Sequence, residues 1–180
     1  MIQILWAACL ATFIMTLADS VGEPMHPGEK TTYRIGVYDP RAIAVAFAGS
    51  EHFKQWMSGL HAEYKKAKAA GDQKRVEELE AEGAARQRRL HTQAFSAAPV
   101  DDILEQIEDR LPSIKQKANV SSLESKWDKE KLAKHPSADR VDLTMELIDA
   151  LNPNERQRKS AIEIQKHKPI PLEQVENMKD

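Results

Sequence analysis

The spacing of apolar positions changes abruptly at Asp39. Before it, the stretch Tyr33–Tyr38 (YRIGVY) is rich in β-branched and aromatic residues, which predicts a short β-strand. After it, Pro40 opens an alanine-rich run, Ala42–Ala48, that favours a helix. The Asp39 carboxylate can accept hydrogen bonds from the free amides of a first helical turn. We therefore expect the strand to pass into the helix within one residue.

A second pattern, in which apolar positions alternate at four and three residues, begins at Phe53. Gly49 and Ser50 precede it, and they predict either a bend or a new helix that Ser50 caps. The spacing is typical of the seam of a coiled coil, and it returns in mirror order after residue 72. Folding the chain back on itself pairs Phe53 with Leu90, Met57 with Arg86, Leu60 with Gly83, Tyr64 with Leu79, and Ala67 with Val76.

The residue numbers in every pair have the same sum, so the fold-back is centred between Gly71 and Asp72. Glycine can close one helix in the left-handed conformation, and aspartate can cap the next. Arg86 fits this seam least well, because its charged end would have to reach solvent past Met57. We expect a helical hairpin arm over 40–99 with its tip at 71–72.

Beyond residue 100 the pattern predicts shorter elements. Residues 101–117 have apolar positions at helical spacing, and Pro112 predicts a kink or a new start there. Residues 119–127 alternate well enough for a strand, and residues 138–151 end in a short helix that Asp142 or Thr144 would cap.

The C-terminal extension, 152–180, contains one more helix start. Asn152-Pro-Asn-Glu155 combines a capping residue, a proline and an acidic residue, so we expect a short helix over 156–166. Pro169–Leu172 (PIPL) predicts an extended tail after it.

The first residues have the character of a secretion signal. Ile2–Leu17 is apolar and is followed by Ala18-Asp19-Ser20, which predicts a cleaved signal peptide over 1–20. An uncleaved anchor is the alternative, but about 16 residues is short for a membrane span. Cleavage would release the chain on the far side of the membrane without stable membrane insertion. Residues 21–32 contain two Pro and two Gly, which predicts a flexible lead-in.

The composition narrows the classes of protein that fit. Of 180 residues, 30% are charged and 6% aromatic, which suits elongated helices with a narrow core better than a compact globule. Cys9, the single cysteine, lies in the predicted signal, so the mature fold would need neither disulfides nor thiolate metal ligands. Removing Asp19 from 28 acidic residues leaves a near balance with 26 basic ones, and this balance gives no support for nucleic-acid binding.

The strand Arg34–Asp39, the mirrored helices and the closing stretch Ala138–Leu151 together resemble the periplasmic chaperone family of Skp, the OmpH-like proteins. In that family an Asp-hydrophobic-Thr stretch precedes a short final helix, as Asp142-Leu-Thr144 does here. The likeness covers residues 33–151. The arms look shorter than in the best-known member, and the strongly basic balance of that member is missing.

The resemblance implies an α+β fold in which a long antiparallel helical hairpin projects from a small β body formed by 33–39 and 100–151. In Skp-like proteins, strands from three chains form a joint barrel, and helical arms hold unfolded outer-membrane proteins without ATP. A single strand in a monomer would leave both its edges unpaired, so we expect it to serve assembly of a homotrimer. The residues expected at the joint are Ile35, Val37, Val120, Leu123 and Trp127.

The resemblance further implies that the inner faces of the arms bind unfolded envelope proteins as clients. The candidate residues combine apolar or aromatic contact with positive charge, which suits many weak contacts. They are Trp56, Met57, Tyr64, Lys65, Lys66, Lys68, Lys74, Arg75, Arg86, Arg88 and Arg89. The alternative is an ordinary charged coiled-coil surface, as in a structural adaptor whose tail, 169–180, binds a partner.

Catalytic chemistry is not indicated, and we expect neither an enzyme nor a cofactor. One acidic cluster predicts only a solvated helix start: Asp101, Asp102, Glu105, Glu108 and Asp109. His52 comes opposite His91 in the fold-back, which suggests a metal- or stress-sensing hairpin as an alternative function. Two histidines without a third ligand do not specify a metal site.

Overall fold

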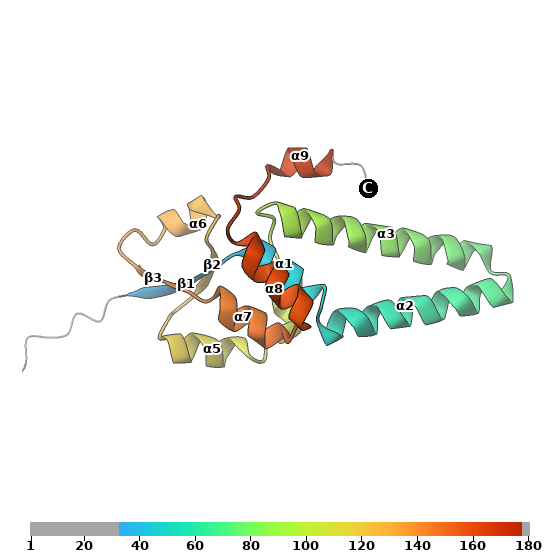
Figure 1. Cartoon of the computed structure of the whole chain (residues 1–180), viewed down its shortest axis with the longest axis horizontal. Helices are drawn as coiled ribbons and strands as arrows, with labels where there is room; N and C mark the ends of the chain where they lie inside the picture. Colours follow the sequence, from blue (N-terminus) through green and yellow to red (C-terminus); the bar gives the residue numbers. More distant parts are fainter. Residues whose placement is uncertain (1–32, 178–180) are drawn as a thin grey trace, which may run out of the picture. The chain divides into compact units, whose positions relative to one another are not determined.

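The computed structural model describes residues 33–177, so the predicted signal peptide (1–20) and lead-in (21–32) lie outside the described residues. The fold is α+β, with many helices around a small parallel sheet (Figure 1). In chain order the elements are β1 (Arg34–Tyr38), α1 (Pro40–Phe47), α2 (Glu51–Ala70), α3 (Gln73–Phe95), α4 (Asp101–Leu104), the 3-10 turn η1 (Glu105–Ile107), α5 (Leu111–Ala118), β2 (Leu123–Ser125), α6 (Lys129–Ala133), β3 (Asp139–Asp142), α7 (Thr144–Leu151), α8 (Glu155–Ile164) and α9 (Leu172–Glu176).

The sheet has the order β2-β1-β3, and both pairs are parallel. Gly36 lies opposite Leu123 of β2 and Val141 of β3. The expectation of a strand without partners in the monomer is therefore wrong, because β1 is the central strand and the chain itself pairs both edges. A Cβ at Gly36 would lie 2.7 Å from side-chain carbons of both Leu123 and Leu143, so the close approach of neighbouring elements requires glycine here.

The two faces of β1 belong to different cores. Ile35 and Val37 pack with Leu132 of α6 on one face. Tyr38 belongs to the larger core on the other face, together with α1, α4, α7 and α8. Alternate residues of a strand point to opposite faces, which is why this short strand joins both cores.

Helix α1 is almost entirely inside the protein. The Asp39 side chain accepts a hydrogen bond from the Arg41 amide, which confirms the predicted cap, and Pro40 occupies the first turn. Its alanines are small enough for α3, α7 and α8 to contact it together. The interior position of α1 follows from this lack of bulk.

Helices α2 and α3 contact each other most closely near the turn that joins them, and they move apart toward the body (Figure 1). Ser50 caps α2 through its hydroxyl, as one of the two predicted alternatives required. Gly71, with φ of 70°, closes α2, and Asp72 caps α3. A small cluster between the helices holds Ala67, Val76 and Leu79, with Leu60 and Tyr64 packed against it.

Several boundaries in the second half differ from the sequence predictions. The predicted helix over 101–117 is broken, and α5 starts afresh at Leu111 with Pro112 in its first turn. The strand predicted over 119–127 is only the three residues of β2, so Val120 and Trp127 lie outside it. Strand β3 and helix α9 were not predicted.

The cap of α8 was placed two residues too early, at Asn152, although the helix expected over 156–166 begins only one residue sooner, at Glu155. Asn152 does not cap α8; it ends α7 in the left-handed conformation with φ of 48°. The α8 cap is Asn154, whose side chain accepts the Gln157 amide. Both residues are asparagines, and the sequence alone does not distinguish the one that closes a helix from the one that opens the next.

Candidate functional site

A largely apolar depression lies between α2 and α3, and we call it the groove. Its volume is about 320 Å³. The residues that line it are Phe53, Trp56, Met57, Leu60, Gly83, Arg86, Gln87, Leu90 and His91. All of them come from the two facing helices, so the groove depends on how these helices pack.

Gly83 is the smallest residue in the α3 wall of the groove. A Cβ there would lie 3.4 Å from Leu60 Cδ2, which is ordinary van der Waals contact, so Leu60 is its neighbour across the groove. Met57 is 41% exposed, although it is apolar. Met57 can thus contact a bound molecule without first being uncovered.

The base of the groove contains a ring stack. Phe47 and Phe53 meet edge to face with centroids 5.6 Å apart, and Phe53 stacks on Trp56 at 5.9 Å. The guanidinium of Arg86 lies 5.4 Å from the Phe47 ring and 5.6 Å from the Trp56 ring. The coiled-coil pairing predicted that Arg86 would extend past Met57 to solvent. Instead, the Arg86 guanidinium makes cation–π contacts with these two rings.

A carboxylate from α4 lies beside Arg86. Asp102 accepts one hydrogen bond from the Gln93 side chain, at 2.7 Å, and lies 3.1 Å from the Arg89 guanidinium. Its second oxygen is buried without a hydrogen bond, and Arg86 Nη1 lies 3.7 Å from it. Asp102 lies in the first turn of α4, as predicted, but its side chain is largely withdrawn from solvent and links the α3 wall of the groove to α4.

The predicted client-binding residues separate into two groups. Trp56, Met57 and Arg86 line the groove. The others do not line it: Tyr64, Lys65, Lys66, Lys68, Lys74, Arg75, Arg88 and Arg89.

The residues nearer the turn between α2 and α3 make local contacts. Arg75 pairs with Glu63 at 2.6 Å, and Tyr64 donates to Glu80 at 3.1 Å. Lys68 lies 5.8 Å from the Tyr64 ring. Exposed pairs of this kind contribute little stability, and their side chains can exchange partners at little cost.

A buried ionic cluster connects β1 to the second half of the chain. The Asp39 carboxylate accepts two hydrogen bonds from the Arg41 side chain, at 3.1 and 2.8 Å, and lies 2.9 Å from Lys126 Nζ. The Trp127 indole donates to it at 3.3 Å, and the Asp39 amide donates to Thr144 Oγ1. Burial alone would raise the pKa of Asp39, but hydrogen bonds from Arg41 and Lys126 overcome it and lower that pKa.

The residues predicted for oligomerisation make contacts within the single chain. Ile35 and Val37 are buried against Leu132. Trp127 stacks under the Arg41 guanidinium, 5.3 Å from its ring centroid, and Leu123 packs against the main core. Val120 is half-buried.

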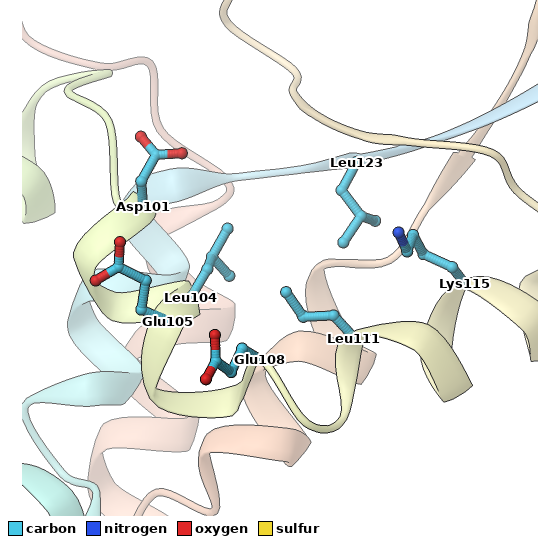
Figure 2. A pocket seen from close by; sticks show the side chains of 7 residues that line it. All are labelled: Asp101, Leu104, Glu105, Glu108, Leu111, Lys115 and Leu123. Atoms are coloured by element: carbon cyan, nitrogen blue, oxygen red, sulfur yellow. The ribbon is translucent and has the colours of Figure 1, made fainter.

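Figure 2 shows a second cavity, of about 400 Å³, with a leucine floor and an acidic rim. Carboxylates from α4 and η1 stand at one end, and Lys115 of α5 stands at the other. The lining residues are Asp101, Leu104, Glu105, Glu108, Leu111, Lys115 and Leu123. Sequence reasoning missed this cavity because its wall combines a broken helix with one residue of β2.

Negative charges in this region also affect the buried hydroxyl of Tyr38. Burial raises the pKa of Tyr38 well above its usual value, and the negative charges of Asp101, Glu124 and Asp128 raise it further. The Tyr38 hydroxyl therefore stays protonated at neutral pH.

The two histidines singled out by the fold-back are both exposed. The His91 ring meets Phe95 edge to face at 6.0 Å, and it lines the groove, whereas His52 does not. Over residues 33–177, no group of three or more His, Cys, Asp or Glu side chains is placed to hold a metal ion.

Comparison of the sequence and structure with known proteins identified no relative. No protein-family model, no curated protein and no solved structure matches the chain. Within the part of the chain that the structure describes, no helix combines the length and the apolar character needed to cross a membrane.

Proposed function

We propose that the protein is a periplasmic, ATP-independent holdase of the Skp type, which binds unfolded envelope and outer-membrane proteins. The groove carries this proposal: it is apolar, open, and bordered by the exposed Met57 and the ring of Trp56. Methionine and aromatic side chains adapt to many apolar partners, which suits a protein that holds unfolded chains without a defined sequence.

The size of the groove limits each contact. About 320 Å³ lies at the lower end of the range for small-molecule pockets, so one groove takes one or two side chains of a client. Weak contacts of this kind hold an unfolded chain only when several act together. The basic side chains along α2 and α3 add long-range attraction to acidic segments of a client.

Several grooves come together only when several copies of the chain associate. In the proposal, α2 and α3 form an antiparallel hairpin arm, and three chains associate through their bodies. The outer sides of β2 and β3 support this, because each is an edge of the three-stranded sheet. Light scattering of the mature chain at micromolar concentration measures its mass, and a monomer would refute the assembly.

The client-binding test compares two neighbouring positions on α2. Met57→Asp places a charge in the groove, whereas Ser58→Asp places one on an exposed position that does not line it. We expect the wild-type chain and Ser58→Asp to keep a denatured outer-membrane β-barrel protein from scattering light after dilution from urea. Met57→Asp should lose most of this activity. Equal activity of both variants, or none in the wild type, would contradict the proposal.

A further inference from the structure

The C-terminal extension touches both points at which the α2–α3 pair joins the rest of the protein. The main-chain amide and the side-chain amide of Asn154 both donate to the Gly49 carbonyl, at 3.0 and 3.4 Å. Gly49 lies in the short link between α1 and α2. At the other end, the Ile170 amide donates at 2.9 Å to the carbonyl of Phe95, the last residue of α3.

The contact at Gly49 leaves no room for a side chain. A Cβ there would lie 2.5 Å from Gln157 Cβ and 2.9 Å from Asn154 Nδ2, closer than atoms of this kind approach each other. The first turn of α8 is thus pressed directly against the link backbone. The start of α2 cannot shift toward α8, and shifting away would break both Asn154 hydrogen bonds.

Between these two contacts the extension is anchored in the body. Ala161 of α8 is fully buried in the core around α1. The fully buried Arg41, which is bound to Asp39, also donates to the His167 carbonyl at 2.8 Å. The extension is therefore fixed to the body before it continues to α3.

The last described helix, α9, lies beside α3 (Figure 1). Val175 is 7% exposed, whereas Leu172, one turn earlier on the same helix, is 47% exposed. Among the described side chains of α9, Val175 is the one that is buried.

From these contacts we infer that residues 152–177 are a strap that fixes the bases of α2 and α3 to the body. Phe53 and Leu90, at the base of the groove, lie within about one and a half turns of Gly49 and Phe95, at 3.6 residues per turn. Loosening the strap therefore changes the groove. The consequence for clients rests on the proposed function, but the mechanical role of the strap does not.

Hydrogen exchange of the full chain tests the strap with matched variants. Val175→Asp removes the buried contact of α9, and Leu172→Asp adds the same charge at an exposed position of the same helix. We expect Val175→Asp to speed exchange of the amides in the last two turns of α3 by about tenfold or more, as the loss of one buried aliphatic side chain implies. Leu172→Asp should leave these amides unchanged.

The first contact has its own pair of variants. Gly49→Ala should speed exchange in the first turns of α2, whereas Gly59→Ala, where a Cβ meets nothing within 4 Å, should not. Unchanged exchange in α3 and α2 for Val175→Asp and Gly49→Ala, or equal acceleration by the control variants, would overturn the strap. Accelerated exchange without any client binding by the wild type would leave the strap standing and would refute only the proposed function.

Discussion

Helices α1 and α2 follow one another along the chain, and each begins behind a capping side chain, yet they are stabilised in opposite ways. Of α1, every residue except Val45 is buried. Of the 20 residues of α2, only Ala67 is buried. Eight residues are too few for a stable isolated helix, so α1 depends on what surrounds it. Helix α2 depends on its own propensity and on one stripe of contacts with α3.

The comparison teaches where this protein can tolerate change. A change near α1 disturbs several packed elements at once, because α3, α7 and α8 all contact it. A change on α2 disturbs one neighbour and leaves most side chains in water. A binding surface that must stay open and adaptable is thus compatible with α2 and not with α1.

The largest difference between α1 and the α2–α3 pair should appear at the aspartates that cap α1 and α3. Asp39→Ala removes a cap and leaves Arg41 and Lys126 without their buried partner, so we expect a loss of about 3–5 kcal/mol of stability. Asp72→Ala removes only the exposed cap of α3 and should cost about 1 kcal/mol. Urea unfolding measures both, and similar losses would contradict the comparison.

Leucines in the two cores provide the next test. Leu147 is fully buried in the main core, and Leu79 is 2% exposed in the small cluster between α2 and α3. Truncation to alanine should cost about 3–5 kcal/mol at Leu147 and about 2–3 kcal/mol at Leu79, because the thinner cluster can close around the smaller side chain. Thermal unfolding monitored by circular dichroism gives the order of the two variants.

Two glycines sharpen the contrast further. Gly36→Ala forces Leu123 and Leu143 to move, since each has a carbon 2.7 Å from the new Cβ, and should cost about 1–3 kcal/mol. Gly59→Ala on α2 meets nothing and should stabilise the protein by about 0.5–1 kcal/mol. A stabilised Gly36→Ala variant would show that the sheet is less closely packed than described.

The smallest effect concerns pH. Because the folded pKa of Asp39 lies below its ordinary value of 3.8, this carboxylate stabilises the fold fully above that pH. The contribution is lost as the pH falls through the folded pKa. Carboxylates of this kind usually titrate between about pH 5 and pH 2. Over this range the free energy of unfolding of Asp39→Asn should therefore fall less steeply than that of the wild type. Urea unfolding at each pH measures both, and the slope with urea should be about the same for the two proteins.

Local signals along the chain identified local features. Asp39 and Ser50 cap the helices that follow them, and Pro112 lies in the first turn of a new helix. Each of these depends on the chemistry of two to four adjacent residues, which a sequence displays directly.

Features that depend on distant partners were missed or misread. Strand β3 has three exposed residues and one half-buried residue, so no apolar pattern marks it, and it is a strand only because β1 lies beside it. Arg86 did not fit the apolar pattern predicted for the contact between α2 and α3. Its partners are the rings of Phe47 and Trp56 and the carboxylate of Asp102, which the pattern does not identify. The groove was anticipated only in part, through Trp56, Met57 and Arg86.

The sequence by itself determined the starts of α1, α2 and α3, the turn at Gly71 and Asp72, and which positions of α2 and α3 carry apolar side chains. Only the tertiary structure decided that β1 is paired on both sides by its own chain, that Asp39 collects Arg41, Lys126 and Trp127, and that the C-terminal extension reaches Gly49 and Phe95. The physical reason is distance along the chain. Caps and periodicity act within a few residues, whereas these contacts join segments that folding alone brings together.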